Sequence, residues 1–265
     1  MIRITHNIDE TISPLLVTAI HEGHEVRPEI LKYFAISESE RLREEDPYTG
    51  FFTDISESRI IVNTSRFEVD LNRPRDQAVY RKPEQSWGLN VWKDNVPVAV
   101  WEYSFGEYDY FYGLLDRTIR KFIDYWGYII VFDIHSYNFR RNGPETEDDP
   151  EMNPEINVGT GKMNRQLWAT VVEHFISKLK SATINGKHLD VRENVKFKGG
   201  NLSNWIHENY GNKSCVISIE FKKIFMDEWT GAVDIQMLKE LKNILKDTIP
   251  GVLRIAEIEH TKSEA

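Results

Sequence analysis

Histidines and carboxylates follow two apolar runs of the sequence, where each predicted strand would end. The stretch "HEGHE" (21–25) follows one run, and "DIHSYN" (133–138) follows another. A third strand-like run, "CVISIEF" (215–221), carries one charged residue, Glu220. Ligands of open α/β sheets bind beyond the carboxyl ends of the strands, so these positions are where chemistry is expected.

These residue types suit a divalent metal. Zn²⁺ is bound by imidazole nitrogen and carboxylate oxygen, and catalytic zinc sites commonly use three protein ligands and keep one position open. His21, His135 and a third residue near His21 would supply such a set, and spacing alone leaves Glu22, His24 and Glu25 as candidates. For either histidine taken singly, a hydrogen-bonded residue at a sheet edge is the alternative.

Asp133 precedes His135 by two residues, so both side chains point to the same face of the predicted strand. A metal-bound histidine usually donates its other N–H to a carboxylate or carbonyl, a role that Asp133 fits. The alternative is an aspartate that caps the backbone at the strand end.

Several charged and amide side chains are concentrated in "NTSRFEVDLNRPRD" (63–76), which includes Arg66, Asn72 and Arg73. Arginine binds carboxylates through two parallel hydrogen bonds, so such a group suits an acidic substrate. A solvated, self-paired patch of surface charge is the alternative.

Short apolar runs alternate with helical patterns along the chain. The runs predict strands at 15–20, 59–65, 96–102, 128–134 and 215–221, and the patterns predict helices at 112–126, 165–182 and 234–248. This alternation indicates an α/β domain, spanning 1–265, with a mixed or mainly parallel sheet covered on both faces. The acidic segment 140–164, rich in Pro, Gly and Asn, is predicted to be an active-site loop, with a solvated insertion as the alternative.

The composition excludes several classes of protein. The formal net charge is -9, and no block of Lys and Arg suggests a nucleic-acid partner. No apolar run is long enough to span a membrane, and the stretch "MIRITHNIDE" (1–10) has no basic segment followed by an apolar core, so a cytoplasmic protein is expected. The single cysteine, Cys215, excludes an internal disulfide.

Taken in order, four segments resemble the N-formylglutamate amidohydrolase family over nearly the whole chain: "HEGHE", "SRFEVDLNR", "FDIHSYN" and "IEFKKIFMDEWTG". This family is similar to aspartoacylases and zinc carboxypeptidases. The resemblance implies a three-layer α/β/α fold with a central mixed, mostly parallel sheet. It also implies hydrolysis of N-formyl-L-glutamate to formate and L-glutamate, with one Zn²⁺ per chain.

The resemblance assigns residues to the metal. It implies that His21 and His135 are zinc ligands. It implies Glu25 as the third ligand, with His24 as the alternative, because related aspartoacylases carry a glutamate at the position that His24 occupies here.

The resemblance also assigns the remaining site residues. It implies that Glu220 acts as general base and then general acid, and that Arg66 polarises the scissile carbonyl. Asn72 and Arg73 would bind the substrate carboxylate, and Asp70 would support the arginines.

Two positions depart from the family pattern. Gly113 stands where family members often carry a histidine, and Ile20 stands where a proline is usual before the first zinc histidine. These departures keep two alternatives open. One is a related hydrolase acting on another N-acyl amino acid or a small γ-glutamyl or peptide amide, and the other is a non-catalytic binding protein of the same fold.

Overall fold

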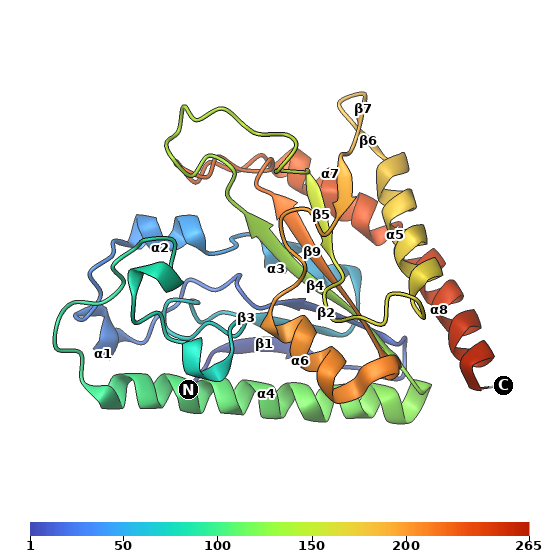
Figure 1. Ribbon diagram of the computed structural model, residues 1–265, viewed down its shortest axis with the longest axis horizontal. Helices are drawn as coiled ribbons and strands as arrows, with labels where there is room; N and C mark the ends of the chain where they lie inside the picture. Colours follow the sequence, from blue (N-terminus) through green and yellow to red (C-terminus); the bar gives the residue numbers. More distant parts are fainter. Residues whose placement is uncertain (265) are drawn as a thin grey trace.

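A seven-stranded sheet forms the centre of the protein, in a computed structural model that describes residues 1–264, with side chains up to Thr261 (Figure 1). The strand order is β1-β3-β2-β4-β9-β5-β8. β1 runs antiparallel to β3, and β5 runs antiparallel to β9, whereas the other neighbours are parallel. The predicted mixed, mostly parallel sheet is therefore confirmed. Its strands are β1 (Ile4–Asn7), β2 (Leu15–Ala19), β3 (Arg59–Val62), β4 (Ile129–Tyr137), β5 (Ile156–Gly159), β8 (Val191–Glu193) and β9 (Ser214–Lys222).

Helices cover both faces of this sheet. They are α1 (Pro28–Leu31), α2 (Glu38–Glu44), α3 (Thr49–Phe52), α4 (Val98–Trp126), α5 (Ala169–Ser181), α6 (Asn201–Tyr210), α7 (Ile235–Lys246) and α8 (Ile249–Glu264). A small hairpin of β6 (Thr183–Ile184) and β7 (Lys187–His188) lies outside the main sheet. No helix in the described part of the chain is both long and apolar enough to cross a membrane.

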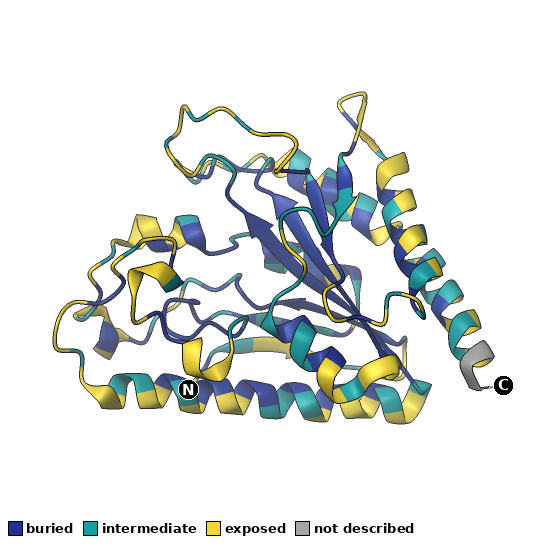
Figure 2. Cartoon of the chain, viewed as in Figure 1, coloured by how far each residue is buried: buried dark blue, intermediate teal, exposed yellow. Residues whose placement is uncertain are grey.

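The three layers follow from alternation along the strands. In β4, Ile129 and Val131 pack in one core with residues of α4 and α6. Ile130 and Phe132, which point the other way, pack in a second core with residues of α5, α7 and α8. Both central strands, β4 and β9, are buried along their full length, as the dark strands in Figure 2 show. The predicted three-layer α/β/α arrangement is confirmed.

The prediction of a strand at 96–102 is wrong, because this segment begins α4. Pro97 is the N-cap residue, and the helix continues to Gly127, which ends it with a positive φ of 81°. A short apolar run cannot by itself be told from a helix segment. Here Val98 is 62% exposed, so the first turn has no strand neighbour, and packing further along the helix holds the segment helical.

The acidic segment 140–164 is not a loop throughout. Its first part is irregular, but Ile156–Gly159 forms β5, which pairs with both β9 and β8. Glu228 accepts hydrogen bonds from the backbone N–H groups of Phe139 (2.8 Å) and Arg140 (2.9 Å), and so fixes the chain where it leaves β4. The insertion is thus tied to the sheet at both ends.

Candidate active site and metal centre

Polar side chains gather where the carboxyl ends of β2, β4 and β9 meet. His135 of β4 and Glu220 of β9 are partners in the parallel register, and His21 follows the end of β2. Register partners project to the same face of a sheet. That face also carries Val131 and Val216, which pack with α4 and α6. The predicted strand-exit residues are therefore brought to one edge and one face.

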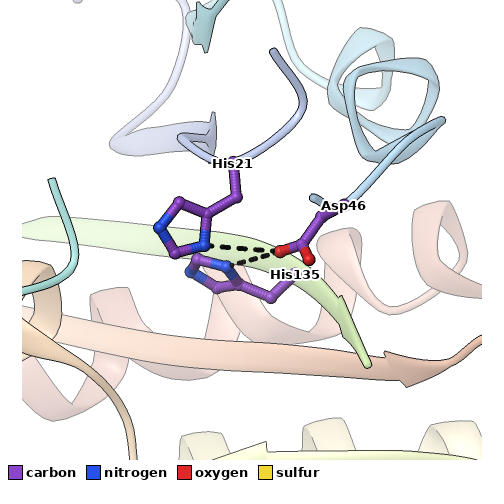
Figure 3. A group of neighbouring side chains, drawn as sticks. All are labelled: His21, Asp46 and His135. Carbon is purple, nitrogen blue, oxygen red and sulfur yellow. Dashed lines mark hydrogen bonds and ion pairs between the residues drawn. The ribbon is translucent and has the colours of Figure 1, made fainter. Parts of the chain in front are cut away.

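Three buried side chains, His21, Asp46 and His135, point at one another at this edge (Figure 3). Asp46 Oδ2 lies 3.0 Å from His135 Nδ1 and 3.5 Å from His21 Nδ1. One ligand atom from each residue lies within 4.8 Å of the other two. Asp46 is held here because its backbone N–H donates to the carbonyl of His21 at 3.0 Å.

Two further carboxylates contact the far nitrogens of the imidazole rings. Asp70 Oδ1 lies 2.7 Å from His21 Nε2, and Asp133 Oδ2 lies 3.1 Å from His135 Nε2. Carboxylates in this position fix the ring orientation of metal-binding histidines. Both rings therefore present Nδ1 toward Asp46.

The donor set fits a divalent cation. Asp46, Asp70, Asp133 and Glu220 are all buried around two imidazoles. Neighbouring cations include Arg66, Arg73 and Lys223. Buried charges need opposite charges close by, and a bound cation is often the largest local charge in such a site. Two imidazole nitrogens and one carboxylate oxygen are ligands typical of catalytic zinc.

The pKa values within the cluster are displaced in opposite directions. Burial alone raises the pKa of Asp46, but hydrogen bonds to His135 and His21 hold it well below its usual range. Burial lowers the pKa of His135, but Asp133 and Asp46 outweigh burial and hold it well above its usual range. Burial raises the pKa of Glu220 to about 8, against the opposing effect of His135. A carboxyl with a pKa near neutrality is suited to accept and return a proton.

Arg66 is buried beside this cluster. Its Nε donates to the Tyr80 hydroxyl (3.0 Å), its Nη2 to Asp70 Oδ2 (2.9 Å) and its Nη1 to the carbonyl of Glu44 (3.3 Å). A guanidinium carries five N–H donors, so these bonds orient it and leave donors for a ligand. The Tyr80 hydroxyl also donates to Asp70.

Asn72 connects the site to the start of α6. Its side-chain Oδ1 accepts from the N–H of Leu202 (3.0 Å), and its carbonyl accepts from the N–H of Asn201 (3.2 Å). These contacts satisfy N–H groups that a helix start otherwise leaves unpaired. Its Nδ2 lies 3.5 Å from His135 Nε2. Gly200 is required here, because a Cβ at this position would overlap the Asn72 carboxamide.

Two tyrosines of α4 hold the backbone on either side of Asn72. The Tyr112 hydroxyl donates to the carbonyl of Leu71 (2.6 Å), and the Tyr108 hydroxyl donates to the carbonyl of Arg73 (3.1 Å). Nδ2 of Asn201 donates to the hydroxyl of Tyr108 at 3.0 Å and to the hydroxyl of Tyr112 at 2.8 Å. The backbone of the Asn72–Arg73 pair is therefore fixed between α4 and α6.

A cavity of about 220 Å³ opens over the cluster. It brings together every site residue predicted from the sequence except Glu25. Its lining residues are His21, Glu44, Asp46, Arg66, Asn72, Arg73, Trp87, His135, Ser136, Tyr137, Asn138, Arg141, Phe197, Gly199, Gly200, Glu220 and Lys223.

The structure does not bring Glu25 to the two histidines. The backbone of Glu25 bridges to Thr64, and its 57% exposed side chain pairs with Arg3 at 2.8 Å. His24, the alternative ligand, faces Glu45 and lies 3.3 Å from Glu38. The backbone of Glu25 pairs with Thr64 after β3, and the side chains of His24 and Glu25 do not face His21 and His135. Asp46 lies beside these two histidines instead.

Sequence reasoning missed Asp46, Trp87, Arg141 and Lys223. Asp46 stands in "REEDPYTG" just after the short α2, so a search restricted to strand ends could not find it. Gly113, which raised the alternative of a different substrate, lies within α4 and is not among the described residues that line the cavity.

A model of the N-formylglutamate amidohydrolase family matches residues 13–226 of the chain. Among solved structures, the chain is similar to an N-formylglutamate amidohydrolase from Ralstonia eutropha JMP134, with a TM-score of 0.74, 15% identity and coverage of 98% of each chain. It is also similar to gene product Atu2144 from Agrobacterium tumefaciens, with a TM-score of 0.64, 12% identity and coverage of 94% of this chain and 95% of that one.

A metallo-carboxypeptidase from Burkholderia cenocepacia is more distant, with a TM-score of 0.40, 15% identity and coverage of 96% of this chain and 65% of that one. No curated protein sequence matches the chain. The mixed sheet, the cavity beyond its strand ends and the family match define a hydrolase of the amidohydrolase class. More particularly, the chain belongs to the N-formylglutamate amidohydrolase family, since the family model covers most of its length.

Proposed function

We propose that this protein is a zinc-dependent amidohydrolase that converts N-formyl-L-glutamate and water to formate and L-glutamate. One observation carries the proposal: a metal-type cluster and a buried carboxyl face the same cavity as a group of anion-binding side chains. The cluster is His21, Asp46 and His135, the carboxyl is Glu220, and the anion-binding residues are Arg66, Asn72 and Arg73.

His21, Asp46 and His135 would hold the zinc, with Asp70 and Asp133 orienting the two rings. When bound, zinc lowers the pKa of water toward neutrality and polarises a carbonyl. We propose Asp46 rather than Glu25 as the third ligand because Asp46 lies beside both histidines, whereas the side chain of Glu25 pairs with Arg3.

Glu220 is the general base and then the general acid in the proposed reaction. It accepts a proton from the attacking water while the water oxygen forms a bond to the formyl carbon. It then returns that proton to the amide nitrogen as the C–N bond breaks, so that formate and the free amine leave. The burial that raises the pKa of Glu220 to about 8 suits both directions of transfer.

The polar wall of the cavity positions the substrate. Arg66 stabilises negative charge that develops on the formyl oxygen, a contribution that can reach about 3 kcal/mol for one donor. Asn72 and Arg73 bind the carboxylate next to the amide, and holding the substrate this way reduces the entropy lost in reaching the transition state.

The first test measures zinc content and formate release together, on protein purified without chelator. We expect about one zinc per chain and turnover of N-formyl-L-glutamate in the wild type. His135→Ala and Asp46→Ala should lose both zinc and activity, whereas Glu25→Ala should keep both. Retention of zinc by Asp46→Ala with its loss from Glu25→Ala would restore Glu25 as the ligand.

A panel of N-acyl amino acids tests the substrate. Formyl-L-glutamate should react faster than acetyl-L-aspartate or a dipeptide. Zinc binding with faster turnover of another member of the panel would support the related hydrolase instead. Zinc binding without any hydrolysis would support a binding protein of the same fold.

A further inference from the structure

Arg141 lines the cavity, and the reaction described above gives it no role. It lies four residues beyond the end of β4, with 38% of its side chain exposed. Its guanidinium lies 5.0 Å from the ring centroid of Trp87, and that of Arg66 lies 4.8 Å from the same centroid. The two arginines are therefore close enough to contact two parts of one small substrate.

Arg141 belongs to a network of ion pairs on the wall of the cavity that carries Trp87 and Glu44. Arg141 pairs with Glu44 at 2.9 Å, and Glu44 is shared with Arg43 at 3.5 Å. Arg43 also lies 3.5 Å from Glu228, and the buried Lys223 interacts electrostatically with Asp46, Glu44 and Glu228. Glu44 is thus shared by Arg141 and Arg43, so its negative charge does not belong to Arg141 alone.

Arg141 is the cation beside Trp87 and Glu44 that a ligand in the cavity can reach. Among the described residues, the cations that line the cavity are Arg66, Arg73, Arg141 and Lys223. Lys223 is 1% exposed, and its Nζ donates to the carbonyls of Arg43 (2.7 Å) and Glu45 (2.8 Å). The ammonium group of Lys223 therefore holds the backbone of Arg43 and Glu45 in place.

The covalent structure of a glutamyl substrate separates its two carboxylates. The α-carboxylate is bonded to the carbon that carries the amide, so it must lie near the reacting bond. Asn72 is the candidate for it, because it lines the cavity together with the three residues of the cluster. The carbon of the side-chain carboxylate lies three bonds from the same carbon, so this carboxylate needs a second cation away from the cluster.

We propose that Arg141 binds the side-chain carboxylate of the substrate and restricts the enzyme to N-acyl derivatives of dicarboxylic amino acids. This inference rests on the proposed function. Nη1 of Arg141 donates to Glu44 Oε1 at 3.1 Å, and Nη2 lies 2.9 Å from Glu44 Oε2, so this pair engages only part of the five N–H donors of the guanidinium. The remaining donors allow Arg141 to bind the substrate carboxylate while Glu44 holds the side chain in place.

The test compares two substrates that differ only in that group, N-formyl-L-glutamate and N-formyl-L-glutamine. Arg141→Gln should lower kcat/KM for the glutamate derivative by about 10- to 100-fold, mainly through KM, since it removes charge-assisted hydrogen bonds. The glutamine derivative should change less than about threefold, because it offers no charge to the missing cation.

Arg140→Gln is the matched control. Arg140 is the adjacent arginine, but it pairs with Asp227 at 2.7 Å and does not line the cavity. This variant should leave both substrates unchanged. Equal loss of both substrates in Arg141→Gln, or no loss of either, would overturn the inference.

Calorimetric binding of L-glutamate and L-glutamine to the zinc-loaded protein separates this inference from the proposed function. The wild type should prefer L-glutamate, and Arg141→Gln should remove the preference. If this result holds without any formate release, only the proposed reaction fails. A wild type that does not discriminate between the two amino acids would contradict the role of Arg141.

Discussion

Burial is the main cause of the raised pKa of Glu220. Its pKa is raised to about 8, mainly by burial and also by Asp46 and Asp133, while His135 and Arg66 oppose the rise. A divalent cation held at the cluster would stabilise the carboxylate and lower this pKa. Zinc binding would thereby convert Glu220 into the form that accepts a proton at neutral pH.

Replacing Glu220 by glutamine should abolish this proton transfer while keeping the size of the side chain. We expect kcat to fall by about 10² to 10⁴, a range typical of the loss of a general base. Zinc content, measured on the same preparation, should stay at the wild-type level because Glu220 is not a ligand. A kcat within about threefold of the wild type would contradict the assigned role.

His207 of α6 provides a prediction about acid sensitivity away from the site. It is buried, and burial lowers its pKa to about 4. Its Nε2 accepts the backbone N–H of Val216 at 3.1 Å, which requires the neutral ring. The unfolded chain binds a proton near pH 6.5 and the folded chain does not, so folding stability falls as pH decreases from about 6.5 to 4.

His207→Gln removes this titration and keeps a hydrogen-bond acceptor. Between pH 7.5 and 5.5, the wild type should lose roughly 1 kcal/mol more unfolding free energy than the variant. Urea unfolding of metal-free protein at the two pH values measures the difference. Equal losses in both proteins would show that His207 stays neutral in the unfolded chain or titrates in the folded one.

At the level of elements, α4 and α6 hold the backbone of the Asn72–Arg73 pair, which we propose to bind the substrate, through the hydroxyl groups of Tyr108 and Tyr112 and the carboxamide of Asn201. Tyr112→Phe would leave the Leu71 carbonyl without its 2.6 Å donor and would remove one of the two hydroxyl groups that accept from Nδ2 of Asn201. We expect KM for N-formyl-L-glutamate to rise several-fold with little change in kcat, because the cluster is not touched.

Tyr110→Phe is the control for this prediction. Tyr110 lies on the same helix but is 46% exposed, so loss of its hydroxyl should change neither constant. Steady-state formate release gives both parameters. A fall in kcat of Tyr112→Phe at unchanged KM would mean that the tyrosine supports the reacting groups rather than the binding pair.

The strands at the centre of the sheet could be predicted from sequence, because strands buried on both faces read as continuous apolar runs. His135 and Glu220 could be found for the same reason, since a charged residue stands out within or just after such a run. The fold class followed from the alternation of runs and helical patterns.

Other features depend on contacts between distant segments. Asp46 reaches His21 through a backbone hydrogen bond that joins the segment after α2 to the segment after β2, and no local pattern encodes that bond. Glu25 was expected at the metal from the resemblance, but pairing of its backbone with the chain after β3 turns it away. The start of α4 was misread because short apolar runs are ambiguous.

At the scale of the whole molecule, the metal cluster joins three distant parts of the chain. His21, Asp46 and His135 come from the segments after β2 and α2 and from β4. A ligand that binds only the folded state stabilises it by about 2.7 kcal/mol at a concentration 100 times its Kd. Removal of zinc should therefore lower the unfolding temperature.

Thermal unfolding with added zinc and with chelator measures this effect, and His135→Ala is the control. The variant should show the same unfolding temperature in both conditions. An equal response of wild type and variant would place the stabilising metal elsewhere.

The register of β4 and β9 makes His135 and Glu220 direct neighbours across one strand pair, whereas Arg73 and Arg141 stand on irregular segments. Strand spacing in a sheet is nearly invariant, and connecting segments tolerate change. In the proposed mechanism, the pair His135 and Glu220 stands on the strands, whereas Arg141, the proposed selectivity residue, stands on a segment that can change separately. Exchange of the segment after β4 between relatives offers a route to amidohydrolases with new substrate ranges on an unchanged catalytic frame.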